Sequence, residues 1–351
     1  MINLNCALRI KPLYNQKNLR KIGYPNYYAN RHSSLAPLKA DTVSFRGVTK
    51  KCNDKDYKEI EEKILKLNEL AQNKDIISHS EISNYLNEKK LKVKPIEEMA
   101  KIGANPDSCY GYTTEDITAN IEYGENKERF ITSFENDCCD MYVPEIKGKD
   151  KKATLSTIAH ECTHVKQIQK NPNLMAEIIR KKLEEKGLNT QEIIITFINE
   201  VQYAVSEISG EMGDNILRNL LKSRCEETRK DVTPLLHNME SALNISLGAK
   251  NTNELNECAK YYMKEVVKIV SNEIKNKHSG EFNKKFTREE EVNKYIQNLV
   301  KKAIIVNLKK EFEAYTNQGK IIKKLHGISE DSLIATDVLA QAHKLLIDNC
   351  D

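Results

Sequence analysis

The sequence lacks any apolar run of the roughly 20 residues that a membrane-spanning helix needs. Its first residues also lack the charged start and apolar core of a signal peptide, because Arg9 and Lys11 interrupt the only candidate stretch. The cysteines number nine, an odd count, and none of them forms a Cys-x-x-Cys pair, which argues against a disulfide framework. We therefore expect a soluble protein of the cytoplasm or another reducing compartment, without a signal peptide or a transmembrane segment.

Acidic residues are almost missing from residues 1–52, which hold 10 Lys and Arg against one acid, Asp41. The remainder holds 45 Lys and Arg against 50 acids, so the net charge of +4 originates in this N-terminal arm. The arm shows no sustained hydrophobic period and is predicted to be largely disordered. A basic arm could contact nucleic acid or acidic lipid, or target an organelle, but a plain leader is the simpler interpretation.

Residues 53–104 are predicted to be helical. Asp54–Asn73 has an amphipathic period, and Ser78-His-Ser-Glu81 is a capping box that opens a second helix to about Lys89. A third, short helix is expected at 96–102. The first two helices faintly resemble a DNA-reading helix-turn-helix, but no cluster of Arg, Asn and Gln marks a recognition helix, so nucleic acid is not the partner we expect.

Residues 105–148 have the composition of strands. Segments 117–123 and 129–134 are predicted to form a β-hairpin, and 141–146 a further strand. Pro144 cannot donate a ladder hydrogen bond, which suits that last strand to a sheet edge. An exposed edge next to a site can hold an extended peptide by backbone pairing.

The rest of the chain is predicted to be helical. A helix from Lys152 to Gln169 contains neither Gly nor Pro. It is followed by predicted helices at about 172–186, 190–222, 231–247, 252–277, 287–318 and 329–349. We therefore expect a mainly helical α+β protein, in which a small sheet and one helix (105–170) pack together and a helical half (171–351) closes a cleft.

The segment His160-Glu161-Cys162-Thr163-His164 has the spacing of a catalytic zinc site. Residues i and i+4 stand on one face of a helix, so the two imidazoles can bind one metal ion. Glu161, about 100° further round the helix, can reach a water on that metal and act first as general base and then as general acid. Zinc needs three protein ligands and one open position for this chemistry, so a third ligand must come from elsewhere. The same periodicity also fits two histidines on a solvated surface helix.

Read as H-E-x-x-H-x-x-Q, His160–Gln167 resembles the zincin metallopeptidases, whose active helix carries two zinc histidines and the general-base glutamate. The sequence departs from the metzincin pattern, because position 167 is Gln rather than Gly and position 170 is Lys rather than His. The resemblance therefore implies one catalytic Zn²⁺ with a third ligand on a downstream helix, as in gluzincins. Lys309–Tyr315 is similar to the E-x-x-A-[D/Y] segment that supplies this ligand, and the match puts Glu311 on the metal.

Other glutamates compete with Glu311 for the third ligand position. If each residue of an α-helix turns the chain by 100°, Glu311 lies on the apolar stripe of its helix. A carboxylate on such a stripe needs a cation or hydrogen-bond donors. Glu313 points about 160° away from Glu311 and is expected at the surface. Glu200 lies at the border of the apolar stripe of another predicted helix. Its distance in sequence from the histidine motif is more usual for gluzincins. Weaker alternatives are Glu207 and Glu211.

The transition state of such a hydrolysis carries negative charge on the carbonyl oxygen, so a donor is also expected at the site. The candidates for this donor are Tyr203, Tyr315 and His326.

The function predicted from these patterns is that of a zinc-dependent metallopeptidase that hydrolyses a peptide or protein substrate through a metal-activated water. Glu161 is the expected catalytic residue, and the expected metal ligands are His160, His164 and Glu311. One alternative is a helical interaction or regulatory protein with a structural or degenerate metal site. Another is a nucleic-acid-binding protein that uses the basic arm.

Overall fold

The sheet that supports the candidate site has four strands in the order β1-β4-β5-β3. A computed structural model describes residues 7–12, 52–102, 110–205, 208, 252–325, 327–328 and 330–350. The strands of the sheet are β1 (Ala7–Pro12), β3 (Leu91–Pro95), β4 (Tyr112–Tyr123) and β5 (Arg129–Val143). Strands β4 and β5 form an antiparallel hairpin, to which β1 and β3 add in parallel on either side. Two short strands, β2 (Ile76–Ile77) and β6 (Ile146–Lys147), form a separate antiparallel pair.

The predicted hairpin is confirmed, but the prediction of a separate strand at 141–146 is wrong. Residues 129–143 form one strand, and its pairing register shifts where Asp116 faces Cys138 and the next residue, Ile117, faces Asn136. This shift inserts Asp137 as an extra residue, and such a bulge interrupts the alternation of a strand without ending it. Pro144 follows directly after β5, which is a central strand, so the expectation of an edge position for it is also wrong.

The N-terminal arm contributes the edge strand β1. Ala7–Pro12 pairs in parallel with Asp116–Ile121 of β4, so the prediction of disorder is wrong for these six residues, while 13–51 lie outside the described residues. The register leaves the first part of β4, Tyr112–Glu115, unpaired by β1. Among the described residues, no other strand pairs with that part of β4 on the side opposite β5.

Helices make up most of the described chain, as predicted. Two capping boxes start the first two helices, one formed by Asn53 with Asp56 and one by Ser78 with Glu81. The helices are α1 (Asp54–Asn73), α2 (His79–Leu86), α3 (Lys151–Lys170), α4 (Leu174–Glu184), a helix over 191–205, α7 (Thr252–Lys277), α8 (Ser279–Lys285), α9 (Glu289–Ile322) and α10 (Glu330–Asp348). The third predicted helix is a 3₁₀ helix, Ile96–Ile102, whereas α8 and β3 were not predicted. The predicted helix 231–247 and the end of 190–222 lie outside the described residues.

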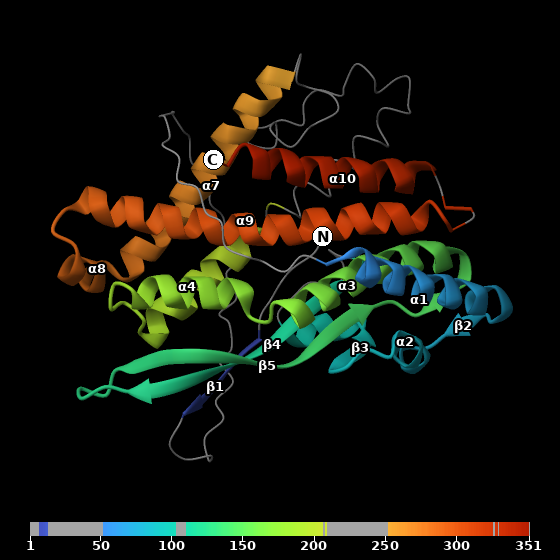
Figure 1. The fold of residues 1–351 in the computed structure, drawn as a ribbon, viewed down its shortest axis with the longest axis horizontal. Helices are drawn as coiled ribbons and strands as arrows, with labels where there is room; N and C mark the ends of the chain where they lie inside the picture. Colours follow the sequence, from blue (N-terminus) through green and yellow to red (C-terminus); the bar gives the residue numbers. More distant parts are fainter. Residues whose placement is uncertain are drawn as a thin grey trace.

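The elements are stacked so that α3 lies between the sheet and the long helix α9 (Figure 1). Helix α10 packs along the other side of α9, and α7 crosses it. With 34 residues, α9 is about 51 Å long. The architecture is therefore α+β and mainly helical.

Two hydrophobic cores meet at α9. Ile304 and Leu308 belong to a core shared with β4, β5, α4 and α7, whereas Ile321 and Ile322 belong to a second core shared with α1, α2 and α3. Glu311 lies on the helix between these two pairs and is fully buried. The third-ligand candidate thus occupies the seam between two apolar cores.

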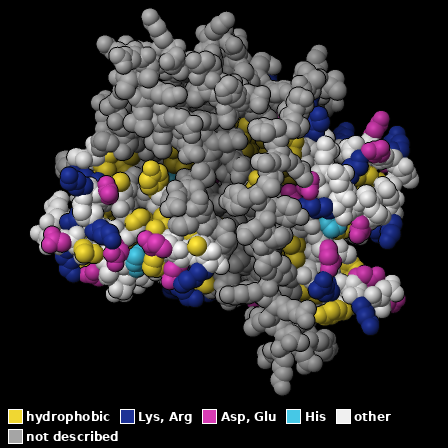
Figure 2. Space-filling model, turned by 180° about the vertical axis from the view of Figure 1, so that it is seen from behind, with side chains coloured by type: hydrophobic (Ala, Val, Ile, Leu, Met, Phe, Trp, Pro, Cys, Tyr) yellow, Lys and Arg dark blue, Asp and Glu magenta, His cyan; other side chains and the backbone are white. Residues whose placement is uncertain are grey.

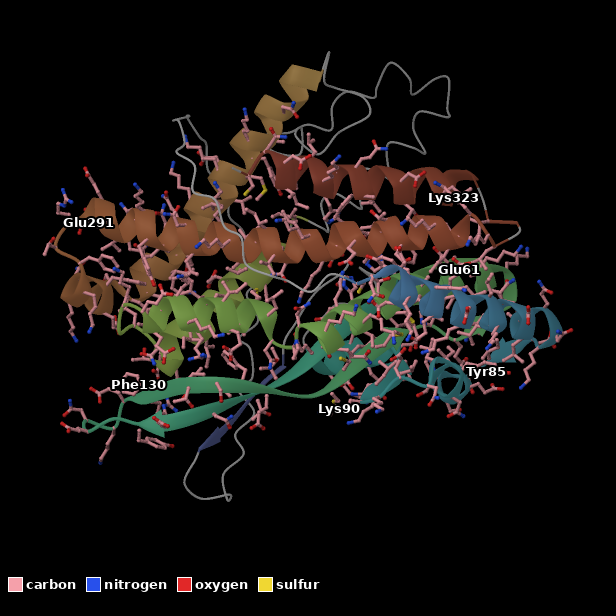
Figure 3. All side chains as sticks on the ribbon, viewed as in Figure 1. Glu61, Tyr85, Lys90, Phe130, Glu291 and Lys323 are labelled. Atoms are coloured by element: carbon pink, nitrogen blue, oxygen red, sulfur yellow. The ribbon has the colours of Figure 1, made fainter. Side chains whose placement is uncertain are left out.

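The outer end of α9 is tied to its neighbours by ion pairs. Lys324 contacts Glu61 of α1 at 2.5 Å, and Lys323 contacts Asp337 of α10 at 3.1 Å. Glu61 and Lys323 are labelled in Figure 3. None of the described helices is long and apolar enough to cross a membrane.

Candidate metal centre

Helix α3 is buried on almost all sides, because the sheet covers one face and α9 another. His160, Glu161 and His164 retain 2%, 1% and 1% of their exposed surface. The interpretation of two histidines on a solvated surface helix is therefore wrong. The polar side of α3 faces the interior, where unpaired polar groups are costly.

Three possible ligand atoms converge between α3 and α9. His160 Nε2 and His164 Nε2 lie 3.0 Å apart, and Glu311 Oε2 lies 3.5 Å from the first and 3.6 Å from the second. Zinc bonds of about 2.0–2.2 Å in a tetrahedron separate neighbouring ligand atoms by about 3.3–3.6 Å. The spacing of these atoms therefore fits one zinc ion, and the three side chains form a buried cluster that could hold a metal.

The carboxylate of Glu311 is the second observation that fits a metal. Neither of its oxygens has a hydrogen-bond partner among the described residues, although the side chain is fully buried. A buried carboxylate in such a position is costly unless a cation compensates it. Although burial raises the pKa of Glu311, the neighbouring His164 and His160 hold this pKa well below its usual range. Conversely, burial alone lowers the pKa of His164, but Glu311 raises it to about 9.

Two glutamines fix the orientation of the histidines. Gln318 Oε1 lies 3.1 Å from His160 Nδ1, and Gln318 in turn donates to Ser156 Oγ at 2.8 Å. Gln167 Oε1 lies 3.0 Å from His164 Nδ1. An amide oxygen accepts, so each Nδ1 carries a proton and each Nε2 is the nitrogen that faces the cluster. Contacts of this kind orient ligands in metal sites and sharpen metal affinity.

Glu313 is half-buried rather than solvent-exposed, contrary to the sequence-based expectation. Its Oε2 accepts from Gln167 Nε2 at 2.9 Å, and its Oε1 accepts from the backbone N–H of Cys52 at 3.0 Å and from the hydroxyl of Tyr57. The helical wheel places it correctly, on a face of α9 away from Glu311. That face is covered by the start of α1, which the wheel alone could not reveal.

Glu161 is held next to the cluster by strand β4. The Thr113 hydroxyl donates to Glu161 Oε2 at 2.8 Å. A Cβ at Gly111 would lie 3.0 Å from Glu161 Oε1 and 2.3 Å from Thr157 Cγ2, so only glycine leaves space at this oxygen. Burial raises the pKa of Glu161, and the two histidines oppose that effect. A carboxylate with a raised pKa suits a group that takes up and releases a proton near neutral pH.

Two aromatic side chains line the α9–α10 side of the cluster. The Tyr315 ring lies 4.4 Å from the His160 ring and 5.3 Å from that of His343. Burial holds the pKa of Tyr315 well above its usual range, so the phenol stays a donor. His343 Nδ1 donates to Leu339 O at 2.8 Å, and its buried Nε2 has no partner among the described residues. Burial also lowers the pKa of His343, so its imidazole is neutral and Nε2 accepts.

Sequence reasoning missed Gln318 and His343. Gln318 had a signal: Glu311, Tyr315 and Gln318 are spaced i, i+4, i+7 and therefore share one face of α9. His343 had none, because nothing in the sequence relates α10 to α9.

Of the remaining candidates, the structure describes Glu200 and Tyr203. Glu200 pairs with Lys277 at 2.6 Å, away from the histidines' contacts. Tyr203 is 59% exposed. The other candidates, Glu207, Glu211 and His326, lie outside the described residues.

The arrangement can thus hold one metal ion by three ligands with a buried carboxylate beside it. The ligands and this carboxylate come from α3 and α9, with Thr113 of β4, Tyr315 of α9 and His343 of α10 as neighbours. No protein-family model, no curated protein and no solved structure matches this chain.

Proposed function

We propose that this protein is a zinc-dependent peptidase of the zincin type. The observation that carries the proposal is the buried triangle of His160 Nε2, His164 Nε2 and Glu311 Oε2, in which the carboxylate has no hydrogen-bond partner among the described residues. Two imidazoles and one carboxylate suit zinc best among the common divalent ions. The stacking of a small sheet, the motif helix and a later helix that brings the third carboxylate supports the zincin comparison.

In this proposal the three ligands hold the ion and Glu161 handles the proton. When bound, zinc supplies Lewis-acid polarisation of the scissile carbonyl and lowers the pKa of water. Glu161 takes the proton of the attacking water, the water oxygen bonds to the carbonyl carbon, and the proton passes to the amine as the C–N bond breaks. Thr113 fixes Oε2 of Glu161, which leaves Oε1 beside Gly111 for the proton. The Tyr315 hydroxyl is the donor we assign to the developing oxyanion.

The part of β4 that β1 leaves unpaired is not an open edge. Tyr112, Thr113, Thr114 and Glu115 retain 0%, 0%, 4% and 6% of their exposed surface. These residues therefore support the general base through Thr113, and the proposal assigns no peptide-docking edge to them.

A second candidate function is a purely structural metal site in a helical interaction protein. The burial of all three ligands favours it, because structural zinc sites are enclosed. Such sites are closed by a fourth protein ligand, and within the described residues the cluster of His, Cys, Asp and Glu side chains contains three. Replacing zinc by cobalt distinguishes the catalytic from the structural site, because cobalt gives the site a visible spectrum. Added acetohydroxamate, a metal-binding ligand, should change the spectrum of a site with an open position and leave that of a closed site unchanged.

A nucleic-acid interface finds no support in the first two helices. Lys63 of α1 is paired with Glu59 and Glu88, and Lys74, directly after α1, is paired with Glu81. On the face shown in Figure 2, basic and acidic side chains are intermixed over the described surface.

The test is hydrolysis by the full chain loaded with zinc. We expect wild type to cleave peptides in a mixed-sequence library, and Glu161→Gln to lose that activity while it keeps one zinc per chain. Glu200→Gln is the matched control and should behave as wild type, because Glu200 pairs with Lys277. Full activity without Glu161, or no product from zinc-loaded wild type, would contradict the proposal.

A further inference from the structure

Gln167 is a buried side chain whose polar atoms all have partners. It retains 4% of its exposed surface. Its Nε2 lies 3.0 Å from the backbone oxygen of Lys310 and 2.9 Å from Oε2 of Glu313. Its Oε1 lies 3.0 Å from Nδ1 of His164. A carboxamide has two donor hydrogens and one acceptor oxygen, so these contacts use both hydrogens and the oxygen.

The partners decide which way round this carboxamide lies. An amide keeps nearly the same shape when its nitrogen and oxygen exchange places, so shape alone does not orient it. A backbone carbonyl and a carboxylate only accept hydrogen bonds, and both lie at the same end of Gln167. That end must therefore be the NH₂ group, and the oxygen must face His164.

The oxygen of Gln167 in turn decides which nitrogen of His164 can bind a metal. An acceptor 3.0 Å from Nδ1 requires a proton there, which leaves Nε2 as the ligand atom. The opposite orientation would place an NH₂ group at Nδ1 and the proton on Nε2. That proton would lie in the space towards His160 Nε2, 3.0 Å away, and would block the metal position.

Glu313 is itself held in place through its other oxygen. Its Oε1 accepts from the backbone N–H of Cys52 at 3.0 Å and from the hydroxyl of Tyr57. Burial and the hydrogen bond to Glu313 hold the pKa of Tyr57 well above its usual range, so the phenol stays a donor. Two donors fix Oε1, and Oε2 is left to accept from Gln167.

We propose that Glu313 is a positioning residue for the zinc ion, a role that rests on the metal site of the proposed peptidase and not on hydrolysis. Its carboxylate holds Gln167 in the orientation that keeps the proton of His164 on Nδ1. Glu313 lies on a different face of α9 from the ligand Glu311, about 160° round the helix. Its effect on the metal therefore passes through one hydrogen-bonded amide.

Glu313→Gln keeps the shape of the side chain but opposes this orientation. Cys52 and Tyr57 both donate, so the new amide turns its oxygen to them and its NH₂ group to the NH₂ group of Gln167. Two donors then face each other, and Gln167 must turn over or withdraw. We expect zinc affinity, measured by competition with a chromophoric chelator, to fall about tenfold.

The matched control is Glu59→Gln. Glu59 also lies beside α3, where it contacts Lys166 at 3.0 Å, and its replacement also removes one negative charge. Its other ion pair is with Lys63 of its own helix, so this change leaves the contacts of Gln167 intact. We expect Glu59→Gln to bind zinc as wild type does. Equal zinc affinities of Glu313→Gln and Glu59→Gln would overturn the proposal.

NMR on the wild-type chain tests the orientation without depending on a folded variant. In the zinc-loaded full chain, labelled with ¹⁵N at histidine and glutamine, we expect His164 to carry its proton on Nδ1. The side-chain NH₂ of Gln167 should exchange slowly with water, in contrast to that of Gln169, which contacts Glu88 on the outside. A proton on Nε2 of His164, or equally fast exchange of the two glutamines, would contradict the role of Glu313.

The same spectra of the variants show whether Glu313 acts through the amide. In Glu313→Gln, the Nδ1 proton of His164 and the NH₂ protons of Gln167 should exchange faster. In Glu59→Gln both should exchange as in wild type. A folded Glu313→Gln protein in which both exchange as in wild type would refute the link.

Zinc binding and proton exchange together separate this role from the proposed function. If wild type binds no zinc but the NH₂ protons of Gln167 are protected and lose that protection in Glu313→Gln, the peptidase proposal fails and the orienting role of Glu313 remains. If wild type binds zinc and cleaves peptides, and Glu313→Gln binds zinc with the same affinity, the role of Glu313 fails and the peptidase remains.

Discussion

Gln167 donates to Glu313 Oε2 at 2.9 Å, and its other end lies 3.0 Å from His164 Nδ1. One glutamine therefore connects a metal ligand on α3 to Glu313 of α9, which itself contacts the start of α1. The link depends on both ends of a single amide group.

Replacing this amide should weaken zinc binding. We expect Gln167→Met to reduce zinc affinity about 10- to 100-fold, because His164 loses the acceptor that fixes its tautomer and ring orientation. Competition with a chromophoric chelator measures the effect. Gln169→Met is the matched control, because Gln169 lies on the same helix but donates to Glu88 on the outside. Equal affinities in both variants would show that Gln167 has no orienting role.

Zinc content should depend on Glu311 and not on Glu200. We expect about one zinc per wild-type chain by elemental analysis, and little or none in Glu311→Ala or His164→Ala. Glu200→Ala should retain the metal, because its partner Lys277 is far along another helix. Retention of zinc by Glu311→Ala would disprove the third ligand.

The stability of the metal-free protein should fall as the pH rises above neutrality. Glu311 raises the pKa of His164 from its usual 6.5 to about 9 in the fold. This contribution to the free energy of unfolding is therefore fully present below pH 6.5 and is lost as the pH rises through 9. The pKa of Glu311 is lowered, so its contribution is present above pH 4.5 and is lost in acid. Urea unfolding of wild type and Glu311→Gln between pH 5 and 9 measures the difference, which should shrink toward pH 9.

Zinc binding should follow the opposite trend in the same range. The ion must displace the proton of His164, so zinc affinity should rise with pH up to about 9 and proton release should accompany binding. Calorimetry in buffers of different ionisation enthalpy counts these protons. No proton release at pH 7 would show that His164 is already neutral there.

Loss of the Thr113 hydroxyl should alter the pH profile without loss of metal. In Thr113→Val, Glu161 loses a donor that lowers its pKa, so the acidic limb of kcat/KM should move to higher pH while zinc content stays the same. Thr114→Val is the control, because neighbouring strand residues face opposite sides. An unshifted limb in Thr113→Val would mean that Glu161 does not govern it.

The sequence predicted the helices well because their signals are local. The period of Asp54–Asn73 and the capping box at Ser78 are complete within a few turns, and both were confirmed. The burial of Glu311 also followed from its position on an apolar stripe. Its approach to the histidines followed from resemblance, not from periodicity.

What could not be predicted depends on contacts between distant segments. The environment of Glu313 is set by Cys52 and Tyr57, more than 250 residues away in sequence. Asn173, Gln202 and Asn307 line one small cavity together with His164 although they come from separate elements, and each looks like an ordinary polar residue in its own helix or turn. The bulge at Asp137 concealed the continuity of β5 in the same way, because a single inserted residue reverses the alternation of a strand.

Strand β1 lies at the start of the chain, but its partner is made much later. Ala7 pairs with Asp116, 109 residues further on, and at ribosomal rates of about 5–20 residues per second this partner emerges on the order of 5–20 s afterwards. The β4–β5 hairpin has only a short turn to close, whereas β1 must close a very long loop. We therefore expect the first strand to be synthesised to be the last to join the sheet, so that the edge of β4 stays open until it does.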